Sequence, residues 1–259
     1  MSFLTGKAAQ PIITPERIDK NRYRAPLFFG AIAVAAAMFS IPMFLTGSTT
    51  TALAMIYLAI FIGSYAVSAW RLKYFLSAGR TYWSHDSHHV VMTTPTGMLL
   101  FEVSVPLLGV LGVPLAAVTW LLHRQGDWIG SAALAALGAL SVPYLLQVLH
   151  GFHPVRRRIT VSKSGIELTQ ANGHSLEIPW KEHPYLIGVR QADAVIVLKN
   201  HLETRYSIGY LPLSMRQLER LLNTFSTDGR LRAKLSGPEA LRTVLAVLEP
   251  TEEERTDGS

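Results

Sequence analysis

The sequence contains no cysteine, and only 16% of its residues are charged. The absence of cysteine excludes disulfide bonds, thiolate metal ligands and a cysteine nucleophile. Soluble globular chains carry about 25% charged residues, so the low charge and the hydrophobic share of 49% favour a membrane protein. The chain also lacks a phosphate-binding glycine loop, a dinucleotide-binding glycine fingerprint, a GxSxG motif and an HExxH motif. The best-known routes to nucleotide and hydrolase chemistry are therefore missing.

Four apolar stretches are each long enough to cross a bilayer, which takes about 20 residues. They cover residues 26–45, 51–70, 98–122 and 129–149. None contains Lys or Arg, and Glu102 is the only acidic residue within them. A carboxylate in a span indicates either an ion pair near the interface or a functional group. We predict a transmembrane domain of four α-helices over 26–150, in which Thr94 is the N-cap of the third span.

Basic residues flank the spans at alternate ends. They precede the first span, separate the second from the third, and follow the fourth: Lys7, Arg17, Lys20, Arg22, Arg24, Arg71, Lys73, Arg80, Arg156, Arg157 and Arg158. The connection after the first span, TGSTT, carries no charge. Because cytoplasmic segments are enriched in Lys and Arg, we predict a multi-pass protein of a bacterial cytoplasmic membrane. Residues 1–25, the loop 71–97 and the C-terminal part are then cytosolic.

Some of these flanking residues are typical of the lipid headgroup layer. Arg71, Lys73 and Trp83 belong to a segment that mixes aromatic and basic side chains, and Arg156, Arg157 and Arg158 follow the fourth span directly. The chain from residue 154 onward has 15 Lys and Arg against 13 Asp and Glu, so the basic excess lies at the membrane edges. The bilayer is therefore the predicted partner of these residues, and nucleic acid is not.

The C-terminal part has the two-residue period of β-strands. Six segments alternate apolar and polar residues: RITV at 158–161, IELT at 166–169, SLEIPW at 175–180, YLIGVR at 185–190, AVIVLKN at 194–200 and ETRYSIGY at 203–210. Turn residues such as Asn172-Gly173 separate them. Pro179 belongs on an edge strand or at a bulge. Trp180 is in phase with Leu176 and Ile178, which predicts a core position for this tryptophan.

Two amphipathic helices are predicted after the strands. Ser214 and Gln217 fit a capping box, followed by the apolar stripe Leu218, Leu221, Leu222 and Phe225. A second capping box at Ser236 and Glu239 precedes the stripe Leu241, Val244, Leu245 and Leu248. We expect an α+β domain over 154–248, in which an antiparallel sheet is capped by a helix. The acidic residues 249–259 are expected to form a solvated tail.

This pattern resembles the PH-like domains of bacterial membrane proteins, in the YcxB-like and bacterial PH families. The resemblance rests on the segment 159–168, on IPWKE at 178–182 and on the leucine pattern of 211–222, and it covers roughly residues 154–226. It implies a cytosolic domain held near the membrane, with no established catalytic residues. The usual layout of that family has two spans before the domain, whereas four are predicted here.

Histidine is concentrated in the strip YWSHDSHH at residues 82–89. If this strip is helical, His85, His88 and His89 share one face. The spacing resembles a histidine box of the membrane desaturase and hydroxylase superfamily, and His150 and His153 at the end of the fourth span supply a second fragment. These five residues are candidate ligands for iron or zinc. The superfamily uses about three boxes, however, and this chain has one box and a fragment.

The sequence thus favours a non-enzymatic accessory, scaffold or regulatory membrane protein, for which no cofactor is expected. Its cytosolic domain would contact a membrane or cytosolic protein partner, or a lipid. Small residues in the fourth span, such as Gly130, Ala132, Ala136, Gly138 and Ala139, also permit a homo-oligomer. The alternative is a histidine-box metalloenzyme that acts on a lipid.

Overall fold

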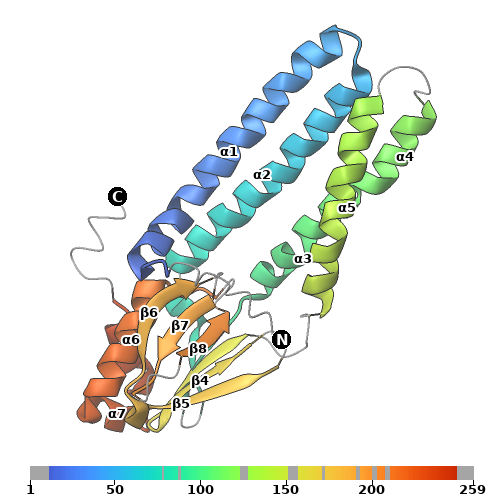
Figure 1. The fold of residues 1–259 in the computed structure, drawn as a ribbon. Coiled ribbons are helices and arrows are strands. Elements are labelled where there is room, and N and C mark those ends of the chain that lie inside the picture. Colours follow the sequence, from blue (N-terminus) through green and yellow to red (C-terminus); the bar gives the residue numbers. More distant parts are fainter. Residues whose placement is uncertain are drawn as a thin grey trace, which may run out of the picture. The chain divides into compact units, whose positions relative to one another are not determined.

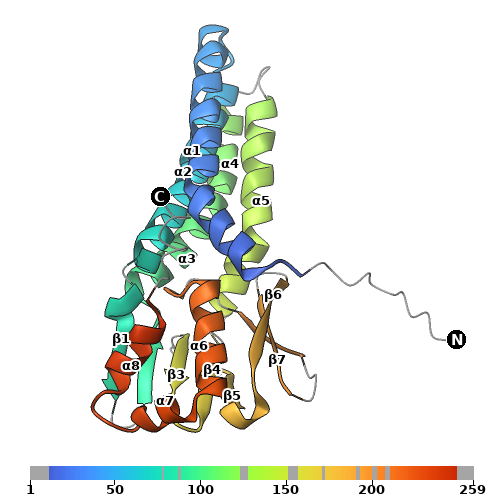
Figure 2. The same ribbon diagram turned by 90° about the vertical axis from the view of Figure 1, so that its left-hand side faces the viewer.

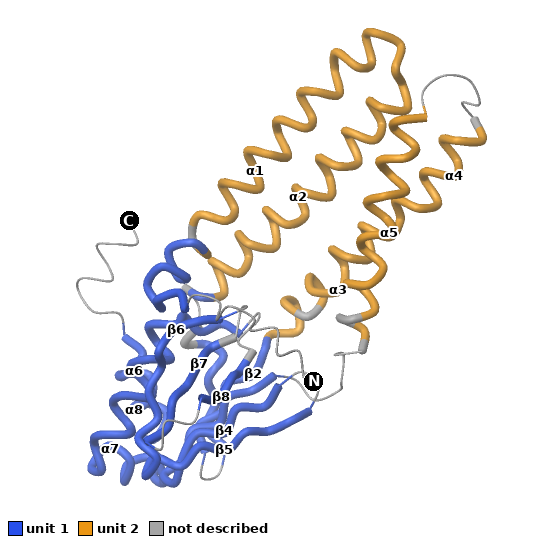
Figure 3. The backbone as a smooth tube through the Cα atoms, in the orientation of Figure 1, with its two compact units in different colours: residues 1–21, 76–94, 155–259 blue, residues 22–75, 95–154 orange. Residues whose placement is uncertain are grey.

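The structure, a computed structural model, describes residues 12–77, 79–86, 89–122, 128–150, 157–170, 173–190, 193–199, 203–207 and 211–249. The chain divides into two compact units, coloured separately in Figure 3. Unit 1 comprises Met1–Asn21, Leu76–Thr94 and Val155–Ser259, and unit 2 comprises Arg22–Phe75 and Pro95–Pro154. Unit 1 therefore collects all three polar segments that the sequence separates by pairs of spans.

Unit 2 is made of long apolar helices (Figure 1). They are most of α1 (Pro15–Leu45) and α2 (Thr49–Ser77), together with α3 (Thr96–Val110), α4 (Gly112–Leu122) and α5 (Trp128–His150). Four helical stretches are long and apolar enough to cross a membrane, namely Pro15–Leu45, Thr49–Leu76, Thr96–Leu121 and Trp128–Leu146. The prediction of four apolar spanning helices is confirmed at this level of length and composition.

The third span is interrupted, contrary to the single helix predicted over 98–122. α3 ends at Val110, Leu111 forms a turn, and α4 begins at Gly112. Pro114 lies where a continuous helix would need an N–H to bond the Val110 carbonyl, and proline has none. The start of the span also differs, because Pro95 is its N-cap and no side chain caps the helix. Thr94 instead accompanies the sheet of unit 1, where its N–H and its hydroxyl donate to the Arg157 carbonyl.

Small residues bring the helices of unit 2 close together. A Cβ added to Gly138 would lie 2.6 Å from the backbone nitrogen of Val113, so α4 and α5 touch at this point without a side chain between them. The hydroxyls of Thr119 and Ser131 are 2.8 Å apart, which satisfies two polar groups inside an apolar bundle. Large side chains such as Leu27 and Leu140 are 78% and 77% exposed. Exposed apolar surface on this scale suits contact with lipid rather than water.

Unit 1 contains two antiparallel sheets. The five-stranded sheet has the order β1 (Trp83–Asp86), β2 (His89–Thr93), β3 (Arg158–Val161), β4 (Gly165–Thr169) and β5 (Ser175–Pro179). The three-stranded sheet has the order β6 (Tyr185–Arg190), β7 (Asp193–Val197) and β8 (Glu203–Ser207). All six predicted strands are present, and Pro179 ends an edge strand as predicted. β1 and β2 were not predicted, because 71–97 was assigned as a loop.

The register places the buried apolar side chains of the five-stranded sheet on one face. Trp83 is opposite Met92, Val90 opposite Val161, and Ile159 opposite Leu168. The six side chains are between 0% and 5% exposed. Trp180 is 2% exposed, and its ring lies 5.7 Å from that of Phe225, which confirms its predicted core position. The inter-span strands β1 and β2 therefore supply part of the core that the C-terminal strands need.

Three helices complete unit 1 (Figure 2). α6 (Met215–Thr227) has the predicted capping box, with Ser214 and Gln217 bonded reciprocally, and its predicted apolar stripe is fully buried. α7 (Gly229–Lys234) and α8 (Ala240–Val247) follow, and α8 packs against β1 and β2. The second predicted capping box is wrong. Residues 235–239 form a turn, so α8 starts four residues after Ser236, and its N-cap Glu239 makes no side-chain cap.

If β2 belongs to the core, its inward side chain should matter far more than its outward neighbour. Met92→Ala should lower the free energy of unfolding of unit 1 by about 2–5 kcal/mol, because it empties a fully buried site. Val91→Ala, on the opposite face of the same strand, should cost less than about 1 kcal/mol. Hydrogen exchange of the β3 amides in the full-length protein measures both values, and equal costs would contradict the shared core.

Candidate functional site

The described residues of the histidine strip lie mainly in two antiparallel strands, β1 and the start of β2, and not in an α-helix. His85 is opposite Val90, whereas Asp86 is opposite His89. Because neighbouring residues on a strand point to opposite faces, His85 and His89 belong to opposite faces of the hairpin. Both side chains are exposed. The shared helical face that a histidine box requires is therefore absent from this part of the chain.

The other three candidate metal ligands lie outside the described side chains. His88 and His153 fall outside the described residues, and His150 is the last residue of α5 with no side-chain position described. Among the residues that the structure does describe, no group of three or more His, Cys, Asp or Glu side chains is arranged to hold a metal ion. The iron or zinc site thus stays a prediction, although His85 and His89 do not share the helix face on which it was based.

The predicted membrane-interface residues fall into different environments. Arg71 and Lys73 are exposed on the last two turns of α2, and the Arg71 guanidinium lies 4.6 Å from the centre of the Phe101 ring. Trp83 is a correction, because it is 5% exposed in the core of unit 1 and cannot reach a headgroup layer. An aromatic residue beside basic ones is as compatible with a half-buried strand as with an interface belt.

The three arginines after the fourth span also separate. Arg156 lies outside the described residues. The Nε and Nη1 atoms of Arg157 are buried, so most of this guanidinium lies inside the domain, and its role as a headgroup anchor stays a prediction. Arg158 begins β3, and its side chain is 47% exposed. Only Arg158 therefore presents a substantial part of its guanidinium at the surface within the described part of this run.

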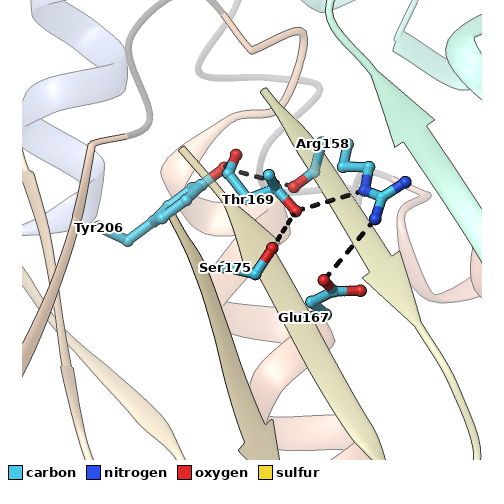
Figure 4. Close-up of polar contacts among 5 residues, drawn as sticks. All are labelled: Arg158, Glu167, Thr169, Ser175 and Tyr206. Carbon is cyan, nitrogen blue, oxygen red and sulfur yellow. Dashed lines mark hydrogen bonds and ion pairs between the residues drawn. The ribbon is translucent and has the colours of Figure 1, made fainter. Parts of the chain in front are cut away.

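Arg158 is the centre of a polar cluster on the outward face of the five-stranded sheet (Figure 4). Its Nε donates to the Thr169 hydroxyl at 3.3 Å, and its Nη2 lies 3.7 Å from the Glu167 carboxylate. The hydroxyls of Thr169 and Ser175 are 3.0 Å apart. Three adjacent strands thus contribute one cation, one carboxylate and two hydroxyls. Thr169 is 1% exposed, so a polar partner could reach Arg158, Glu167 and Ser175 but not the Thr169 hydroxyl, and the cluster contains no activated nucleophile.

Tyr206, on β8 of the three-stranded sheet, forms hydrogen bonds to the backbone of this cluster. Its hydroxyl donates to the Thr169 carbonyl at 3.0 Å and approaches the Arg158 carbonyl at 3.5 Å. The side chain is fully buried. Burial raises the pKa of the Tyr206 phenol well above its ordinary value of 10.0, and the positive charge of Arg157 acts weakly in the opposite direction. The phenol is therefore neutral and acts as a hydrogen-bond donor, which suits a structural role.

The outward face of the sheet extends beyond this cluster. The register lines up Ser84, Val91, Thr160, Glu167 and Glu177 across all five strands. Glu167 and Glu177 are direct neighbours, an arrangement that repels unless a cation lies nearby. Arg158 supplies that cation to Glu167. The face combines both signs of charge with hydroxyl groups, and Ser84 and Glu177 at its two edges are exposed.

A surface groove lies between α7 and α8. It has a volume of about 480 Å³ and is lined by Leu231, Lys234, Glu239, Arg242, Thr243, Ala246 and Val247. Lys234, Glu239 and Arg242 are exposed at its rim. The groove combines apolar and charged side chains.

Two residues that form buried hydrogen bonds were not recognised as important from the sequence. Tyr206 was assigned only to a strand, and Asp19 was not considered at all. Asp19 is 6% exposed, and its carboxylate accepts from the Met215 and Arg216 amides at 3.0 and 3.1 Å. The only local signal for Asp19 was an acidic residue, with Glu16 nearby, in a segment rich in basic ones. The partner is almost 200 positions away, so no periodicity could have identified it.

Tyr206→Phe should lower the free energy of unfolding of unit 1 by about 1–2 kcal/mol, since it removes one buried hydrogen bond. The pH dependence has a definite sign. A raised folded-state pKa contributes stability that is complete below pH 10 and is lost as the pH rises further, because the unfolded phenol ionises first.

The free energy of unfolding should therefore fall less between about pH 8 and about pH 11 for Tyr206→Phe than for the unaltered protein. Tyr185→Phe is the matched control, because Tyr185 is 44% exposed and should leave the pH profile unchanged. Identical profiles for Tyr206→Phe and the unaltered protein would contradict the buried donor.

Comparison of the chain with known protein families, with curated proteins and with solved structures finds none that matches it.

Proposed function

We propose that this protein is a non-enzymatic scaffold or regulatory protein of a bacterial cytoplasmic membrane, which presents a PH-like domain to a protein partner in the cytosol. The observation that carries the proposal is the composition of unit 1. Segments from the start of α1, between α2 and α3, and after α5 fold into one body with one core. Such a body presents a surface that separate segments of the chain build together.

The PH-like plan is supported by the order of the elements. That plan folds a six- or seven-stranded antiparallel sheet over one amphipathic helix. β2–β5 and β6–β8 supply seven strands in two antiparallel sheets, and α6 follows them with a fully buried apolar stripe. β1 is an additional edge strand in this comparison, and the two helical spans between β2 and β3 are an insertion.

The predicted topology is supported by the same co-folding. A compact unit cannot have parts on both sides of a bilayer, so segments 12–21, 76–94 and 157–249 would share one side. The basic residues that flank the spans favour the cytosol as that side. The connections 46–48 and 123–127 would then face outward.

The outward face of the five-stranded sheet is the surface that we assign to the partner. Anionic headgroups favour uniformly basic surfaces, whereas this face carries Asp86 and Glu177 as well as Arg158. Mixed charge with hydroxyls is more typical of protein recognition, in which complementary charges set the orientation of the two surfaces. A protein partner is therefore favoured over a lipid at this face.

The absence of cysteine makes the topology directly testable. Thr46→Cys, in the first short connection, should react with a membrane-impermeant maleimide added to intact cells. Ser84→Cys, exposed in the hairpin of unit 1, should react only after the cells are opened. The reverse labelling pattern would place unit 1 outside the cytosol.

The partner surface can be tested by photo-crosslinking in native membranes. A photoreactive residue at position 84 or 177 should give adducts with one specific protein, whereas the same residue at position 242, exposed on α8, should not. Glu177→Lys should reduce the yield from position 84 at least about tenfold, because it reverses a charge at the face. Adducts with lipid alone, or equal adducts from all three positions, would contradict the assigned surface.

Truncation of the C-terminal part is unsuitable for this test. Removing residues 157–249 would leave β2 without its partner β3 and would expose the inward side chains of the hairpin. The full chain with surface substitutions keeps the domain intact, so a lost adduct reports the interaction and not the fold.

A further inference from the structure

Residues 12–21, the N-terminal strap, are bound to unit 1 at two places. Ile13 forms an antiparallel bridge with Val189 on the edge strand β6, through hydrogen bonds of 3.0 and 2.9 Å. Asp19, one turn into α1, accepts from the first two amides of α6. Glu16 adds an ion pair of 2.9 Å with Arg216. The strap is therefore an integral part of the domain and not a free leader.

The Asp19 contact completes the N-terminus of α6. The first amides of any helix have no partner within the helix. In the capping box the Ser214 hydroxyl accepts from the Gln217 amide. The Asp19 carboxylate accepts from the amides of Met215 and Arg216. A carboxylate at this end is also favoured by the helix dipole. α6 thus depends on a residue of α1 for two of its cap bonds.

α6 in turn holds other parts of unit 1. Its Leu218, Leu221 and Leu222 are 0% exposed in the core, and it packs against β6. The side chains of Gln217 and Arg220 both donate to the Leu248 carbonyl at the end of α8, each at 3.3 Å. The first two turns of α6 therefore join the strap, the second sheet and the C-terminal helix.

The strap and the first span belong to one helix. α1 runs from Pro15 to Leu45, so only six residues separate Asp19 from Pro26, where the predicted span begins. An α-helix rises 1.5 Å and turns 100° per residue, so seven positions place the two about 10 Å apart along the axis. Pro26 lies inside α1 and lacks the N–H that would bond the Arg22 carbonyl. A rotation or shift of the span that α1 transmits past this position would either carry Asp19 with it or break its bonds.

We propose that Asp19 is a mechanical latch, which couples the rotational position of the first span to the order of α6. When the latch is closed, the α6 cap is complete and the unit is rigid. When α1 turns, the Met215 and Arg216 amides lose their acceptor and the first turn of α6 loosens. This inference concerns regulation of the domain, and it does not require that the proposed partner be found.

Hydrogen exchange of the full-length protein in lipid nanodiscs tests the latch. Asp19→Asn should speed exchange of the Met215 and Arg216 amides about fivefold to tenfold, since it removes a charged cap. Asp228→Asn is the matched control, because Asp228 caps α7 through the Arg230 and Leu231 amides. That variant should speed exchange at Arg230 and Leu231 and leave α6 unchanged.

The coupling itself is tested by changing the phase of α1. One alanine inserted between Arg24 and Ala25 turns the span by about 100° relative to Asp19. It changes neither Asp19 nor the residues of α6 that Asp19 bonds. It should speed exchange at Met215 and Arg216 to the same extent as Asp19→Asn. One alanine inserted between Gly47 and Ser48, at the other end of the span, should have no effect on α6.

Two outcomes would overturn the proposal. If Asp19→Asn speeds exchange but the phase insertion does not, Asp19 is a static cap and there is no coupling. If neither variant changes exchange at Met215 and Arg216, the cap itself is refuted. Should Asp19→Asn unfold unit 1, seen as fast exchange throughout β3 and β4, the phase insertion still decides, because its protein retains the carboxylate.

Discussion

The pairing of β2 with β3 is the interaction on which the rest of the structure depends. It joins the segment between α2 and α3 to the segment after α5, from Val90 opposite Val161 to Thr93 opposite Arg158. Thr94 lies between β2 and the N-cap of α3, and its hydrogen bonds to the Arg157 carbonyl continue this pairing by one residue. The two antiparallel strands are connected through the three apolar helices α3, α4 and α5, and this connectivity makes the domain a product of several segments.

The two units of the chain bury their side chains in opposite ways. In unit 2, large apolar side chains point outward and glycines allow close contact inside, as expected where lipid replaces water. In unit 1 the large apolar side chains point inward, and the buried polar groups of Tyr206 and Asp19 are paired. Tyr206 bridges the two sheets, and Asp19 completes α6. Each of these polar bonds joins segments that are distant in sequence, so the core and its polar ties specify the same arrangement.

Local patterns in the sequence predicted the elements whose signals are local. The six C-terminal strands followed from alternation and turn residues, and the capping box of α6 followed from the spacing of Ser214 and Gln217. β1 and β2 were missed because the alternation of their inward residues Trp83, Val90 and Met92 is interrupted by the polar, histidine-rich residues 84–89. The break at Leu111 was missed because the apolar run 98–122 continues through it without a change in composition. The contacts of Asp19 and Tyr206 depend on tertiary structure, which no window of the sequence contains.

The insertion of two spans between β2 and β3 has a consequence for biosynthesis. The β1–β2 hairpin leaves the ribosome before its partner strand exists, and a gap of roughly 65 residues must be made and inserted before β3 appears. At 5–20 residues per second this is a wait of roughly 3 to 13 seconds. During that time Val90 and Met92 have no sheet to cover them, and an unpaired strand edge is a hazard for aggregation. The exposed Asp86, His85 and His89 at the hairpin tip keep this waiting segment polar at one end until the domain closes around it.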